Sequence, residues 1–177
     1  MGRVSELVTG LSRRLQAAGY TDRAEGRIGE VEFRAVLATG PHRPPRRLCA
    51  VVEAGPEVAG LGAAEALLQR VRRSLRRAYA GRLPWPKRLG TFTVLLGGRD
   101  LCERLHDRQG RLIDAGGWHV NVLLGAVIVD AETWQTRSDN TWGLLDTGDD
   151  FRCIQDAVAS WCRSHRRART NPALHVA

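Results

Sequence analysis

Lysine is almost absent from this chain of 177 residues, although it carries 27 basic side chains. Lys87 is the single lysine, so the remaining 26 of the 27 are arginines. Such a one-sided choice, together with abundant Ala, Gly, Leu and Val, indicates a coding bias. The total positive charge is therefore weak evidence for a polyanionic partner, and the distribution of the charge along the chain matters more.

Paired cysteines are also missing. The four cysteines are far apart and form no Cys-x-x-Cys pair, which gives no sign of a zinc cage or a redox dithiol. We expect buried, reduced thiols, because free cysteine is among the most buried residue types. They are Cys49, Cys102, Cys153 and Cys162.

Long apolar runs are missing as well. No run approaches the roughly 18 apolar residues that a membrane span needs, and the first residues lack the apolar core of a signal peptide. We therefore expect a cytoplasmic protein without a membrane partner.

Motifs that require one particular chemistry are absent. The chain has no Gly-x-Ser-x-Gly elbow, no phosphate loop, and five histidines without metal-ligand spacing. The sequence thus predicts no catalytic residue, no cofactor and no metal site.

What the chain does have is enough apolar sequence for a stable core. With 43% hydrophobic residues, 177 residues fit one domain. We predict a single globular domain over residues 1–166 and a disordered basic tail over residues 167–177.

The apolar pattern predicts an α/β fold, with α+β as the alternative. Spacings of three and four predict helices, and alternation or unbroken apolar runs predict strands. The expected order is α-β-β-α-β-α-β-β-α, with a mixed sheet of about five strands flanked by helices. Helices are predicted over residues 4–18, 61–78 and 100–106 and from about 147 onward, and strands over 30–37, 48–52, 91–96, 118–130 and 134–138.

One strand gives information about layering. The run from Leu48 to Val52 is apolar without alternation. Such a strand is covered on both faces, so we expect helices on each side of the sheet.

Charge is unevenly distributed along the chain. No Asp or Glu occurs between Ala66 and Arg99, whereas the segment 130–156 is acidic. The arginines of the second predicted helix lie opposite its apolar stripe and suit phosphates or carboxylates, with which arginine pairs bidentately. The predicted binding residues are Arg70, Arg72, Arg73, Arg76, Arg77, Arg82, Trp85, Lys87 and Arg88.

The leading hypothesis is a non-catalytic interaction module that binds an acidic partner, either a protein surface or a nucleic acid, through this arginine-rich helix. Two simpler explanations stay open. The arginines form a solvated helix face, or they pair with the acidic segment 130–156 of the same chain or of a neighbour. Aromatic residues for stacking are sparse near the patch, where Tyr79 and Trp85 are the nearest.

A second hypothesis is a degenerate or variant metal-dependent nuclease. The predicted order helix, two strands, helix, strand is compatible with the core of restriction-endonuclease-like nucleases, in which carboxylates on adjacent strands hold Mg²⁺. Glu32 and Glu53 are the candidate ligands, but no lysine follows Glu53 at the acid-x-lysine spacing. A third hypothesis is a structural subunit of a larger complex.

The stretch from Trp118 to Gly143 holds a long apolar run between two polar, Trp-containing clusters. It predicts a strand that returns through a hairpin. Convergent polar side chains there would form a cleft for a small ligand, whereas a core hairpin with its ends closed by tryptophans is the simpler interpretation. The cleft candidates are His119, Asn121, Asp139 and Asn140.

Overall fold

The structure is a computed structural model. It describes residues 3–40, 46–58, 60–80, 89–99, 101, 121–140 and 148–170, and every structural statement below concerns these residues.

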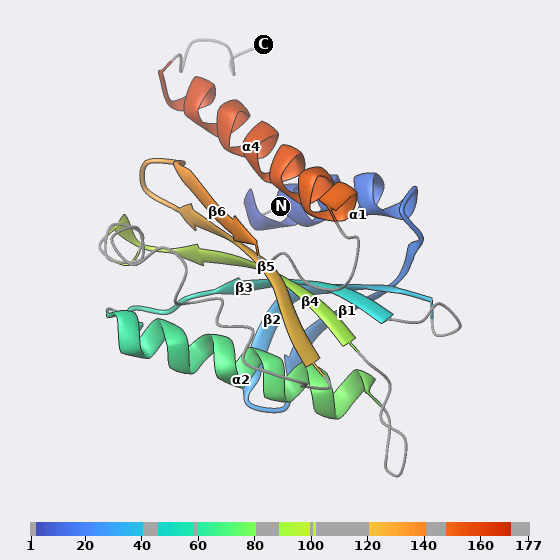
Figure 1. The fold of residues 1–177 in the computed structure, drawn as a ribbon. Helices are drawn as coiled ribbons and strands as arrows, with labels where there is room; N and C mark the ends of the chain where they lie inside the picture. The colour runs from blue at the N-terminus through green and yellow to red at the C-terminus, as the bar shows by residue number, and fades with distance from the viewer. Residues whose placement is uncertain are drawn as a thin grey trace.

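The described part of the chain contains helices on both faces of one six-stranded sheet (Figure 1). The helices are α1 (Arg3–Gln16), α2 (Leu61–Tyr79) and α4 (Gly148–Thr170). The strands are β1 (Tyr20–Ile28), β2 (Val31–Thr39), β3 (Arg46–Glu53), β4 (Leu89–Gly97), β5 (Asn121–Asp130) and β6 (Thr136–Asn140).

The strands follow one another across the sheet in chain order. Strands β1, β2 and β3 form an antiparallel meander, β3, β4 and β5 are parallel, and β6 pairs antiparallel with β5 at the edge. Helix α2 makes the crossover between the parallel strands β3 and β4, as such a connection requires. The mixed α/β fold predicted from the sequence is confirmed.

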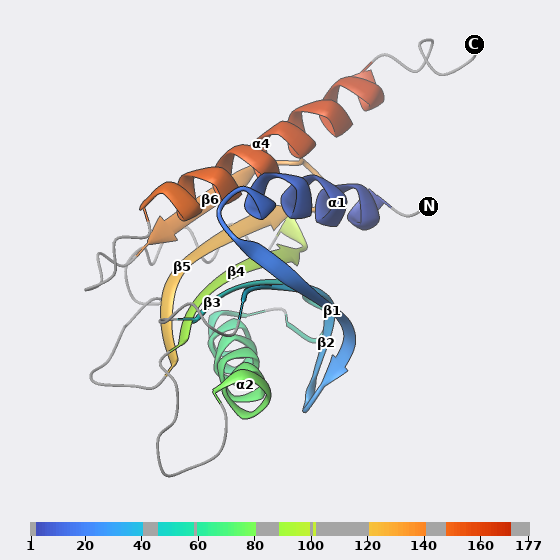
Figure 2. The ribbon, with the colours of Figure 1, turned by 90° about the vertical axis from the view of Figure 1, so that its right-hand side faces the viewer.

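The two faces of the sheet carry separate hydrophobic cores. Helices α1 and α4 lie side by side over one face and α2 covers the other (Figure 2). Leu11 and Ile154 pack with Phe92 in the first core, and Leu75 packs with Phe33 in the second. Strands β3 and β4 contribute buried side chains to both cores. This confirms the two-sided burial expected for the run from residue 48 to 52.

The strand count was predicted too low because β1 gives almost no pattern in the sequence. It is an edge strand in which Tyr20 is buried while most of the other described side chains are half-buried or exposed, and its pairing with β2 is interrupted twice by register shifts. An edge strand of this kind has neither an apolar run nor clean alternation. The described order therefore begins α-β-β-β-α rather than α-β-β-α.

Several predicted boundaries also differ from the structure by a few residues. Strand β6 begins at Thr136, two residues after its predicted start at Trp134. Helix α4 continues to Thr170 and so includes the first residues of the predicted tail. Of the short helix predicted over residues 100–106, Leu101 is helical and the remainder lies outside the described residues.

Candidate functional site on helix α2

Helix α2 is held on the sheet by an apolar stripe at spacings of three and four. Leu67, Leu68, Val71 and Leu75 are buried against the second core, as the sequence predicted. The helix starts after Gly60, which has an extended backbone, and ends where the Ala80 N–H donates to the carbonyl of Arg76. The opposite side of α2 faces away from the sheet.

We call the exposed side of this helix the outer face of α2. Its residues are small or polar, and three of them are arginines in the second half of the helix. The outer face consists of Gly62, Glu65, Ala66, Gln69, Arg73, Arg76, Arg77 and Ala78.

The predicted binding set divides into three groups. Arg73, Arg76 and Arg77 are exposed on the outer face, and Arg70 is half-buried at its margin. Arg72 is half-buried, and desolvation lowers the pKa of its guanidinium, so it does not share the environment of the outer arginines. The remaining members, Arg82, Trp85, Lys87 and Arg88, lie outside the described residues.

The outer arginines have almost no acidic neighbours. Arg77 Nη1 lies 4.0 Å from Glu30 Oε1, and both side chains are mostly exposed. Arg73 and Arg76 make no ion pair with any residue that the structure describes. Exposed pairs at this distance contribute little energy, so positive charge on the outer face stays available to a partner.

The turn that carries Glu30 is packed onto α2. Gly29 in this turn has a φ of +62°, and a Cβ added there would lie 2.9 Å from Ser74 Oγ. Ser74 is buried under the turn. The fold thus places Glu30 near Arg77, a neighbourhood that sequence reasoning missed because it depends on how the β1–β2 hairpin meets α2.

Pairing of α2 with the acidic helix segment of the same chain is not found. Asp149, Asp150 and Asp156 lie on α4, across the sheet from α2 (Figure 2). Asp130 is buried at the end of β5 and is used locally. The intramolecular explanation for the arginine face therefore fails for these carboxylates.

Asp130 stabilises the turn between β5 and β6. Its carboxylate accepts hydrogen bonds from the backbone N–H of Glu132 at 2.7 Å and of Thr133 at 3.1 Å, and from the Thr133 hydroxyl. The turn places Trp134 in a left-handed conformation with a φ of 57°. Burial acts to raise the pKa of Asp130, but these hydrogen bonds and the charge of Arg99 lower it below its ordinary value.

We expect acid to weaken this turn. Because the pKa of Asp130 is lower in the folded protein than in the unfolded chain, its stabilisation is present above the unfolded pKa and is lost as the pH falls through the folded pKa. Asp130→Asn should therefore be destabilising at pH 7, and its difference from wild type should shrink towards pH 2. Urea unfolding of both proteins across this pH range measures the effect; a pH-independent difference would contradict it.

A second buried carboxylate joins three elements. Asp150, at the start of α4, receives a hydrogen bond from the Tyr20 hydroxyl at 2.9 Å and forms an ion pair with Arg47 Nη1 at 2.7 Å. Burial raises the pKa of Tyr20, and the Asp150 carboxylate raises it further. Arg47 also reaches the carbonyl of Ala18 at 3.5 Å. This network ties β1 and β3 to α4 and is structural.

Two of the three described cysteines are buried as expected, and Cys102 lies outside the described residues. Cys49 and Cys162 are buried free thiols, and Cys153 is half-buried. Burial raises the pKa of Cys49 to about 12, with a contribution from the nearby Asp150, and raises that of Cys162 to about 11. High pKa values keep both thiols protonated and poorly nucleophilic.

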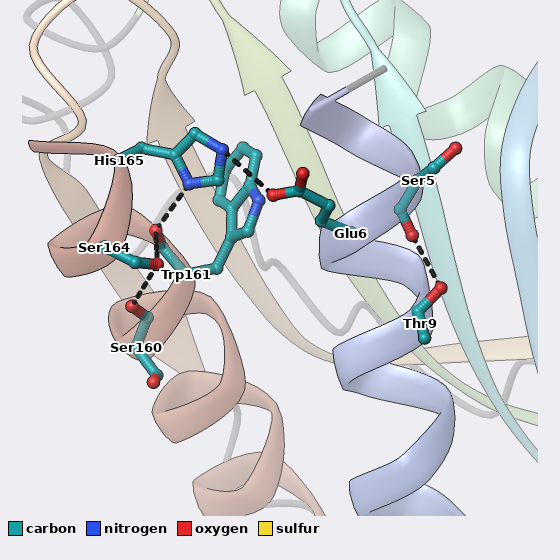
Figure 3. Close-up of polar contacts among 7 residues, drawn as sticks. All are labelled: Ser5, Glu6, Thr9, Ser160, Trp161, Ser164 and His165. Carbon is teal, nitrogen blue, oxygen red and sulfur yellow. Dashed lines mark hydrogen bonds and ion pairs between the residues drawn. The ribbon is translucent and has the colours of Figure 1, made fainter. Parts of the chain in front are cut away.

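The beginning of α1 and the last part of α4 meet at His165 (Figure 3). Its Nδ1 lies 2.9 Å from the carbonyl oxygen of Trp161, and its Nε2 lies 3.3 Å from Glu6 Oε2. The imidazole also packs on the rings of Trp134 and Trp161, with centroids 5.1 and 4.8 Å away. Trp134 and Trp161 belong to the first core, and the His165 side chain is only 13% exposed, so the cluster caps that core rather than forming an open site.

The carboxylates of the nuclease hypothesis do not form a metal site in the described part of the chain. Glu53, at the end of β3, is paired with Arg34, whose Nε donates to Glu53 Oε2 at 2.8 Å. Glu32 is exposed on β2. Among the described residues, no three of the types His, Cys, Asp and Glu are grouped to hold a metal ion.

Three of the four candidates for a polar cleft have described backbone positions, on β5 and β6. On β6, Asp139 pairs with Ala126 and Asn140 with Gly125. Asn121 lies four residues earlier on β5, about 13 Å from Gly125 along the strand. The side chains of Asn121, Asp139 and Asn140, and the whole of His119, lie outside what the structure describes, so the cleft stays a prediction.

Comparison of this chain with protein-family models, with curated proteins and with solved structures finds no match. Among the described helices, none is long and apolar enough to cross a membrane. The outer face of α2 is therefore the feature from which we infer a function.

Proposed function

We propose that this protein is a non-catalytic interaction module that binds an acidic partner through the outer face of α2. One observation carries the proposal. Arg73, Arg76 and Arg77 project from about one turn of helix into solvent, and the described acidic residues of α4 lie across the sheet from them.

The chemistry of arginine supports this role. Its guanidinium is always charged, less strongly hydrated than an ammonium group, and able to bind phosphate or carboxylate with two parallel hydrogen bonds. Arg76 and Arg77 also lie in the last turn of α2, where positive charge interacts favourably with the helix dipole. The helix dipole thus accounts for the positions of Arg76 and Arg77 at the helix end, but not for that of Arg73, a turn earlier.

The test is a triple charge reversal. Arg73→Glu, Arg76→Glu and Arg77→Glu remove two charge units each, which lowers the formal net charge from +8 to +2. We expect partner binding, measured as pull-down from the native host at low and high salt and with nuclease treatment, to be salt-sensitive in wild type and lost in the variant.

The matched control reverses three exposed arginines on the other side of the sheet, Arg13 and Arg14 on α1 and Arg163 on α4. It has the same net charge and should keep its partner. Because glutamate at the end of α2 weakens the helix, the triple change to glutamine is the second variant, and circular dichroism checks folding of all three proteins. Retention of the same partner by both α2 variants would refute the proposal.

A further inference from the structure

We propose that the partner of the outer face of α2 is a nucleic-acid duplex, held through its backbone phosphates without reading of base sequence. The inference rests on the proposed function and narrows it from an acidic partner to one class. The exposed composition of α2, the surroundings of its aromatic residue Tyr79, and its position in the fold carry it.

The outer face lacks the apolar anchors that protein interfaces use. A protein partner would normally bury aromatic or large aliphatic side chains at the centre of the contact. On α2 the apolar residues larger than alanine that the structure describes, Leu67, Leu68, Val71 and Leu75, are buried in the core. Small or polar residues and arginines remain, which matches the polar and positive surfaces that bind nucleic-acid backbones.

The outer face also lacks a platform for unpaired bases. Proteins that bind single strands stack successive bases on exposed aromatic rings. Tyr79, the aromatic residue of α2, is half-buried, and the guanidinium carbon of Arg46 lies 4.9 Å from the centre of its ring. With that ring already covered by Arg46, a duplex, which presents its phosphates outward, suits this surface better than a single strand.

The shape and spacing of the charges agree with this partner. Among the described helices, α2 alone lies on its side of the sheet, where the strands curl around it and leave the arginines of its outer face exposed (Figure 2). From Arg70 to Arg77 the helix rises about 10 Å, over which duplex DNA offers one phosphate charge per roughly 1.7 Å of its axis. Several arginines can therefore meet phosphates at once.

We would measure binding of a 20-base-pair DNA duplex of mixed sequence by fluorescence anisotropy at several salt concentrations. Each arginine that neutralises a phosphate contributes about 0.9 to the slope of log K against log salt. Arg73→Gln, Arg76→Gln and Arg77→Gln together should thus lower the slope by about 2.7. In wild type these contacts account for a roughly 40-fold loss of affinity between 50 and 200 mM salt.

Removal of the negative charge of Glu30 should raise duplex affinity, the opposite of the effect expected from replacing the arginines. The Glu30 carboxylate lies 4.0 Å from Arg77 and would repel a phosphate bound there. Glu30→Gln should therefore raise duplex affinity a few-fold at low salt. Asp156→Asn removes the same charge from an exposed position on α4, across the sheet, and should change affinity much less. Equal effects of the two changes would contradict placement of the duplex on α2.

Two further probes, single-stranded oligo-dT of 20 nucleotides and polyglutamate of comparable charge, separate the possible outcomes. Stronger binding of the duplex than of either probe, lost in the glutamine variant, supports the inference. If the α2 arginines bind polyglutamate or oligo-dT as tightly as the duplex, the duplex inference is overturned while the proposed acidic-partner function stands. If their replacement changes binding of no probe and of no host partner, both fail.

Discussion

Replacement of Asp150 by alanine should lower the free energy of unfolding by about 3–5 kcal/mol, the usual cost of removing one partner of a buried ion pair. The Asp150 and Arg47 side chains are 6% and 19% exposed and are joined at 2.7 Å. Without the carboxylate, Arg47 keeps its charge in a poorly hydrated site and Tyr20 loses its hydrogen-bond acceptor. For a chain of this size we expect the melting temperature to fall by roughly 6–20 °C.

Urea unfolding and thermal denaturation, both followed by circular dichroism, measure this effect. The control is Glu53→Ala, which breaks the ion pair with Arg34 in which both side chains are about half exposed. Exposed pairs contribute about 0–1 kcal/mol, so this variant should unfold close to wild type.

A double variant isolates the cause. Arg47→Met with Asp150→Leu removes both charges and should recover much of the lost stability, because apolar pairs often replace buried ion pairs without loss. If Asp150→Ala is no more damaging than Glu53→Ala, the network around Asp150 does not hold α4 in place.

This network also shows where prediction from sequence ends. Arg47 lies at the start of β3, directly before its buried residues, and Asp150 lies in the first turn of a helix. Each has a local explanation: Arg47 flanks an apolar run, and Asp150 interacts with the helix dipole. Their pairing depends on α4 crossing the end of β3, a long-range arrangement with no local pattern. The acidic appearance of segment 130–156 was therefore misleading, since its buried carboxylates Asp130 and Asp150 have partners inside the protein.

The local patterns were reliable wherever one face or both faces of an element are buried. Strand β3 was predicted because both of its faces are covered, and β1 was missed because neither is covered along most of its length. On α2, helical spacing predicted the exposed arginines. It also explains Arg72, which lies four residues after Leu68 and three before Leu75 and so borders the buried stripe.

The contact between Gly125 and Phe151 should also contribute strongly to the stability of the fold. Phe151 on α4 is 5% exposed and stacks on Phe92 of β4 with ring centroids 5.8 Å apart. It fits because β5 has no side chain at Gly125, where an added Cβ would lie 2.6 Å from a carbon of the Phe151 ring. Phe151→Ala should cost about 3–5 kcal/mol through loss of the ring and the cavity left behind.

The effect of Gly125→Ala on the free energy of unfolding should have opposite signs in wild type and in Phe151→Ala. In wild type the new methyl group collides with the Phe151 ring, and overpacking of this kind costs about 1–3 kcal/mol. In Phe151→Ala the ring is gone, so the same methyl group fills part of the cavity and should restore about 1 kcal/mol. Urea unfolding of the two single variants and the double variant gives the coupling energy directly.

Gly10→Ala is the control for the effect of replacing glycine by alanine where the new methyl group meets no neighbour. Gly10 lies within α1, and a Cβ added there meets no atom within 4 Å. Gly10→Ala should therefore stabilise the protein by about 0.5–1 kcal/mol, because alanine favours the helix and restricts the unfolded chain. If Gly125→Ala stabilised wild type as Gly10→Ala does, α4 could not pack against β5 through the ring of Phe151. The cover of the first core would then have to be assigned to other contacts.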